Sequence, residues 1–64
     1  MNSNELIVGQ NYIVEISGLQ DAKEYTLTGV MTFAVYRAVF NDENGSGWQL
    51  REDQIAECVK PISS

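Results

Sequence analysis

The sequence predicts an all-β domain in which five short strands form one strongly bent antiparallel sheet, closed into a small barrel. Three observations predict this class. β-prone runs follow one another along most of the chain, turn residues separate them, and the longest run has a glycine at its centre. At 64 residues the chain fits a single domain. We expect residues 1–9 to form an N-terminal arm and residues 10–61 to form the barrel.

The first strand is predicted over Gln10–Ser17, where apolar and polar residues alternate with the period of a half-buried strand. We expect Ser17–Lys23 to be a polar connection. The second strand is predicted over Glu24–Phe33, and we expect Gly29 to mark the bend that a barrel strand requires. One face of this strand is predicted to carry Tyr25, Leu27, Gly29, Met31 and Phe33.

The third strand is predicted over Val35–Asn41. Apolar residues occupy both of its faces, a pattern typical of strands that are covered on two sides, and a subunit contact is one explanation. The Asn44-Gly45 pair predicts a hairpin turn, since asparagine and glycine adopt the positive φ angles that such turns need. Trp48–Leu50 then resumes the sheet.

The end of the chain predicts a polar turn and a closing strand. Residues 51–54 are polar and predict a single helical turn with Asp53 as its cap. The last strand is predicted over Ile55–Val59, and Lys60-Pro61 ends it because proline has no N–H to donate.

The composition is acidic, with nine Asp and Glu against four Lys and Arg, for a net charge of −5. Such a surface repels phosphate backbones and anionic lipid, so nucleic-acid binding is disfavoured; it suits a basic partner, or simply keeps the protein soluble. No apolar run reaches the roughly 20 residues that span a bilayer, and the first residues lack the basic start of a signal peptide. Because the chain also has a single cysteine, we expect a cytoplasmic protein without membrane contact.

Catalytic and cofactor chemistry is not indicated. The chain has no histidine and no acid–base pair at a telling spacing, so nothing would activate a nucleophile. Cys58 is the only cysteine, so an internal disulfide is excluded. In a chain without histidine, this one thiol cannot supply the ligand set of a structural zinc. Its apolar neighbours indicate a buried structural thiol. We therefore expect no enzyme activity, no cofactor and no metal.

Four residues are candidate contacts for a partner: Phe33, Tyr36, Trp48 and Arg51. Aromatic side chains line peptide-binding grooves and stack on single-stranded bases, and core packing is the alternative for each of them. For Phe33 the core is favoured, whereas for Trp48, beside a glycine-rich turn, burial and partial exposure are equally open. Arg51 stands next to two acidic residues, so it is either half of a solvated ion pair or a single cation for a partner.

Five segments follow one another in an order shared with a known class of barrels. They are the V-x-I-x-G motif of Val14–Gly18, the glycine-centred strand at Leu27–Met31, the hairpin from Tyr36 to Leu50, the polar turn at Arg51–Ile55, and a closing strand that ends in Lys60-Pro61. Over about residues 10–61 the chain resembles small SH3-like barrels and, within them, is similar to Sm-like proteins. The resemblance implies RNA binding by the loop after the bent strand, at Thr32, Phe33 and Tyr36, and by Arg51–Gln54.

Two main hypotheses for function follow from these observations. The leading one is a non-enzymatic interaction module that binds a protein partner or copies of itself; small acidic domains of this kind occur among phage and mobile-element products. The alternative is an Sm-like homo-oligomeric ring that binds RNA or single-stranded nucleic acid by aromatic stacking. The ring requires Lys23, Arg37, Arg51 and Lys60 to cluster on one face, because they are the only basic residues. An accessory domain of an enzyme is a third hypothesis, which no residue specifically supports.

Overall fold

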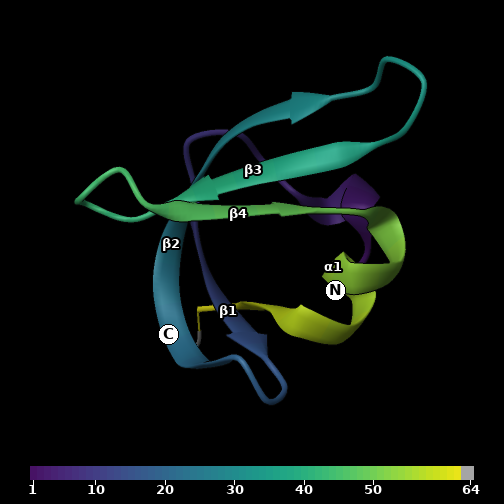
Figure 1. Ribbon diagram of the computed structural model, residues 1–64. Coiled ribbons are helices and arrows are strands. Elements are labelled where there is room, and N and C mark those ends of the chain that lie inside the picture. The colour runs from purple at the N-terminus through teal and green to yellow at the C-terminus, as the bar shows by residue number, and fades with distance from the viewer. Residues whose placement is uncertain (63–64) are drawn as a thin grey trace.

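The computed structural model describes residues 1–62 and shows one five-stranded antiparallel sheet with a short helix (Figure 1). In chain order the elements are η1 (Ser3–Glu5), β1 (Asn11–Ile16), β2 (Gln20–Met31), β3 (Arg37–Asn41), β4 (Gly47–Leu50), α1 (Glu52–Cys58) and β5 (Val59–Pro61). The strand order is β4-β3-β2-β1-β5. The predicted all-β class is therefore confirmed. Closure into a barrel stays a prediction, because β4 and β5 are the outer strands and the pairings found within residues 1–62 do not join them.

The bend of the sheet is concentrated in β2, which is twelve residues long and belongs to both halves of the sheet. Its first half pairs with β1 and its second half with β3, and Thr26 pairs with both neighbours. The register to β3 shifts between Leu27 and Gly29. Such a bulge bends and twists a strand. In Figure 1, β2 accordingly curves from the β1 side of the molecule to the β3–β4 hairpin, so the predicted bend at Gly29 is confirmed.

The connection between β1 and β2 is shorter than predicted. Instead of Ser17–Lys23 it comprises residues 17–19, and the pairing of β2 with β1 begins at Gln20, opposite Ile16. The turn closes with a hydrogen bond from the Leu19 N–H to the Ile16 carbonyl, at 2.9 Å. The polar composition of this segment misled the sequence prediction, because outward-facing strand positions accept polar side chains as readily as loops do.

The core lies between the two halves of the bent sheet and under α1. Tyr12 and Phe40 meet there edge to face, with ring centroids 6.3 Å apart, a geometry that suits the charge distribution of aromatic rings. The predicted alternation in β1 is confirmed, since Tyr12 and Val14 are buried and Glu15 is exposed. The buried apolar side chains come from the five strands and α1: Tyr12, Val14, Tyr25, Leu27, Ala38, Phe40, Leu50, Ile55 and Val59.

The prediction of a last strand over Ile55–Val59 is wrong, because this segment is helical as far as Cys58. Ile55 and Val59 are four residues apart, so one face of a helical turn buries both of them in the core. Strand alternation would have placed Glu57 on that same buried face, where a carboxylate is costly. The strand that follows, β5, pairs with β1. Figure 1 shows α1 between the end of β4 and the last strand of the chain.

The helix begins two residues earlier than a cap at Asp53 would allow, because Arg51 is the capping residue. Arg51 has extended backbone angles and precedes the first helical residue, and its N–H donates to Oε1 of Gln54 at 2.9 Å. Glu52 and Asp53 occupy the first turn, where negative charge interacts favourably with the helix dipole. The acidic residues of the predicted turn thus start a helix of seven residues.

Candidate functional site

Phe33 lies in the loop between β2 and β3, and its side chain is 96 % exposed. The prediction that it belongs to the core is therefore wrong. Two features explain the error: the bulge after Leu27 changes which side chains face inward, and β2 ends at Met31, before the chain reaches Phe33. Val35 also lies in this loop, because β3 begins only at Arg37 and not at Val35 as predicted.

The loop is tightly turned around Ala34. The Val35 N–H donates to the Phe33 carbonyl at 2.7 Å, which closes a three-residue γ-turn, and Ala34 has a φ of 64°. The left-handed region costs a residue with a Cβ atom about 1 kcal/mol or more. Met31, Phe33 and Val35 are all exposed, and together with Arg37 they line a shallow apolar depression. We call these four residues the aromatic tip.

Tyr36 and Arg51, the next two candidate contacts, do not line the depression at the aromatic tip. Tyr36 is half-buried against the core, and burial together with the nearby Glu52 carboxylate raises the pKa of its hydroxyl. The guanidinium of Arg51 is exposed, with its Nε 3.5 Å from Oδ1 of Asp53. This is the solvated ion pair that the sequence offered as one of two roles for Arg51, a contact that adds little stability.

Trp48 is directed away from the tip. Its Nε1–H donates to Oε1 of Gln20 at 2.9 Å, and the same oxygen accepts a hydrogen bond from the Tyr25 hydroxyl. The amide nitrogen of Gln20 in turn donates to the Val14 carbonyl at 3.1 Å. Trp48 is half-buried, and its indole joins β4 to the beginning of β2. The structure therefore separates Trp48 from Phe33, and it reveals Gln20 as the residue that fixes the indole.

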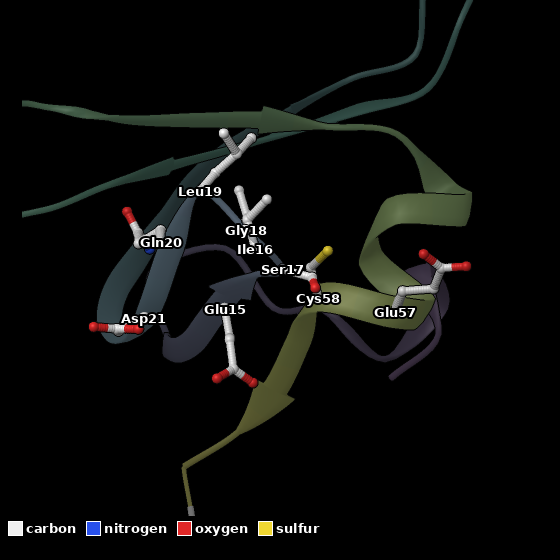
Figure 2. A pocket seen from close by; sticks show the side chains of 9 residues that line it. All are labelled: Glu15, Ile16, Ser17, Gly18, Leu19, Gln20, Asp21, Glu57 and Cys58. Atoms are coloured by element: carbon white, nitrogen blue, oxygen red, sulfur yellow. The ribbon is translucent and has the colours of Figure 1, made fainter.

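A second surface feature is a groove beside the β1–β2 turn, which Figure 2 shows from close by. Its apolar members are Ile16, Leu19 and Cys58, and Leu19 is 76 % exposed. The carboxylates at its margin belong to Glu15, Asp21 and Glu57. We call these six residues the acidic groove. Burial raises the pKa of the Cys58 thiol, and the negative charges of Glu57 and Glu15 raise it further.

The sequence pattern does not predict this groove. A leucine in a polar turn beside a glycine was the available signal. Gly18 has a φ of 79°, so it permits the tight turn that projects Leu19 outward. The helical end that contributes Glu57 and Cys58 to the groove lies about forty residues away in sequence, a distance over which periodicity carries no information.

The four basic residues are dispersed over different elements. Lys23 Nζ lies 2.8 Å from Oδ2 of Asp42, and Lys60 Nζ lies 3.9 Å from Oε1 of Glu15. Arg51 has its contact with Asp53 at the start of α1. Within residues 1–62, Arg37 is the one basic side chain without an ion pair. It lines the aromatic tip.

Among residues 1–62, no three side chains of Asp, Glu or Cys gather so that they could hold a metal ion. The same residues include no helix long and apolar enough to cross a membrane.

The chain matches no protein-family model, no curated protein and no solved structure in the comparisons made. Its class therefore comes from the fold and the surface alone. It is a small all-β domain of one antiparallel sheet, with an exposed aromatic tip and an acidic groove.

Proposed function

We propose that this protein is a non-enzymatic interaction module that binds another protein, or a second copy of itself, through the aromatic tip. The observation that carries the proposal is the exposure of Phe33, a residue that is 96 % exposed on a tightly turned loop. Burying such a side chain in a partner contributes about 1.5–3 kcal/mol. Aromatic anchors of this kind dominate the energetics of protein interfaces.

Two properties of the tip support a binding role over a purely structural one. Ala34 holds a strained φ of 64° that the loop maintains without burying Phe33. Strained backbone is concentrated at binding and catalytic sites, where it fixes a side chain in advance. In addition, the exposed apolar residues Met31 and Val35 flank the ring, so a partner would cover a continuous apolar surface.

The charges favour a protein over a nucleic acid as the partner. The alternative hypothesis, a ring that binds RNA, requires basic residues on one face. Instead, Lys23, Arg51 and Lys60 each have an acidic neighbour within 4.0 Å. The net charge of −5 further opposes a polyanion.

The test compares wild-type protein with Phe33→Ser and with a matched control, Val8→Ser. Val8 is 56 % exposed and lies outside both named surfaces, so the control removes apolar surface elsewhere. Each protein is immobilised at equal density, bound proteins from a cell extract are quantified, and solution mass is measured by light scattering. We expect Phe33→Ser to bind less protein from the extract than the wild type, or to lose self-association. Val8→Ser should behave like the wild type in both measurements. Identical binding and identical mass for all three proteins would refute the proposal.

A further inference from the structure

The aromatic tip and the acidic groove lie at opposite ends of β2. The β1–β2 turn, which carries Leu19, directly precedes the first residue of β2, and Phe33 follows its last residue by two positions. Figure 1 shows these two connections on opposite sides of the molecule. One chain therefore cannot bring its own tip into its own groove, whereas two chains in head-to-tail arrangement can bring them together.

The two surfaces are complementary in charge. The depression at the tip is lined by apolar residues, Gln49 and Thr32, with Arg37 as its only charged member. Arg37 has no ion pair within residues 1–62. The groove carries the three carboxylates of Glu15, Asp21 and Glu57 against one basic neighbour, Lys60. An approaching Arg37 would thus meet a net negative margin, which favours this orientation over others.

The two surfaces also match in their apolar parts. Phe33 is exposed and has no contact that buries its ring. In the groove, the exposed Leu19 and the half-buried Ile16 form an apolar strip between the carboxylates. A ring laid on this strip would remove both from water, while Arg37 reaches the margin. Apolar anchors surrounded by paired charges are the usual composition of a specific protein contact.

We propose that the acidic groove of one chain receives the aromatic tip of a second copy, so that the protein associates head to tail. This inference rests on the proposed function and names the partner. The contact is heterologous, since it joins two different surfaces. Each added copy leaves one free tip and one free groove. Association therefore continues until a ring closes or the chains form an open array.

The test measures mass against concentration by sedimentation equilibrium, from roughly 10 μM to 1 mM, the range that covers weak protein contacts. Phe33→Ser removes the tip and leaves the groove, and Glu57→Lys reverses a groove charge and leaves the tip. Both side chains are exposed, so both variants should fold, which circular dichroism checks. Glu43→Lys, in the β3–β4 loop, is the control for the change in net charge.

We expect the wild type and Glu43→Lys to associate, and each of the other two variants to raise the dissociation constant about tenfold or more. An equimolar mixture of Phe33→Ser and Glu57→Lys should form a complex of two chains and nothing larger, because it contains only one competent tip and one competent groove per pair. A wild type that stays monomeric, equal association of all variants, or a mixture that stays monomeric would each overturn the inference. If the wild type is monomeric but binds a foreign protein that Phe33→Ser no longer binds, the proposed function stands and this inference fails.

Discussion

Gly47 at the start of β4 is expected to be irreplaceable, because main-chain atoms of β3 occupy the space of a side chain there. A Cβ atom placed on Gly47 would lie 1.6 Å from the Phe40 carbonyl oxygen and 2.9 Å from Cα of Asn41. Close C···O contacts between strands are about 3.3–3.6 Å. Gly47→Ala therefore requires a displacement of roughly 1.7 Å between β3 and β4, taken from that difference. The displacement falls where Gly47 pairs with Asn41, and it opens the hairpin.

The expected loss of stability is about 3 kcal/mol, from overpacking against backbone together with weakened hydrogen bonds at the end of a four-residue strand. A domain of this size has a total stability of roughly 3–10 kcal/mol. The assay is urea denaturation followed by circular dichroism and by fluorescence of Trp48, which neighbours the site. With a slope of about 1 kcal/mol per molar urea, the midpoint should fall by about 3 M.

Gly29→Ala is the matched control for this prediction. Gly29 also lies in a strand, but a Cβ atom on it would meet no atom within 4 Å, and its φ is not in the left-handed region. We expect the free energy of unfolding of Gly29→Ala to stay within about 0.5 kcal/mol of the wild type, or to rise, because alanine restricts the unfolded chain. The reasoning is refuted if Gly47→Ala denatures like the wild type, or if Gly29→Ala is equally damaging.

Three further predictions concern the loops and the thiol. Ala34→Gly should stabilise the fold by about 1–2 kcal/mol, because glycine adopts the positive φ of this loop position without strain, and should cost about 0.4–1 kcal/mol through the added freedom of the unfolded chain. We therefore expect thermal denaturation to show a melting temperature about 4 °C higher than that of the wild type. A lower melting temperature would contradict the strain at Ala34. The hydrogen bond from Lys23 holds the pKa of Asp42 below its usual 3.8, so this carboxylate stabilises the fold above pH 3.8 and ceases to do so as the pH falls through its lowered value. Asp42→Asn should therefore be less stable than the wild type at pH 7, and its free energy of unfolding should fall less as the pH is lowered. Urea titrations at several pH values measure both effects. An unchanged pH dependence of stability would exclude Asp42 as its source. Cys58, whose pKa is raised, should react with a thiol reagent at pH 7.5 more slowly in the folded protein than in urea, and equal rates would contradict its placement.

The β3–β4 loop shows how closely local chemistry predicted some of the structure. Asn44-Gly45 predicted a hairpin turn, and Gly45 has a φ of 84° between two paired strands. Asp42 also lies inside this loop. Its side chain is 6 % exposed and accepts hydrogen bonds from the N–H groups of Asn44 and Ser46 in addition to its contact with Lys23. The turn was readable because its residues are adjacent, whereas the contact with Lys23 crosses nineteen positions.

The two main errors have a common physical origin in segments that are too short for periodicity to decide. The spacing of Ile55 and Val59 is compatible with a strand and with a helix, and the helix forms because Glu57 can then remain in water. Phe33 was assigned to the core by counting alternate positions from Leu27. The bulge between Leu27 and Gly29 inserts one residue into that count and reverses its result.

The sequence by itself determined the all-β class, the hairpin turn at Asn44-Gly45, the acidic charge and the lack of histidine and of a second cysteine, since these depend on composition and on neighbouring residues. The tertiary structure alone decided which aromatic rings are exposed and which residues share a surface. Gln20 and Trp48 are 28 positions apart, and the acidic groove joins the β1–β2 turn to the end of α1. Such arrangements follow from strand register and from the bend of β2, which are set by packing of the whole sheet and not by any local pattern.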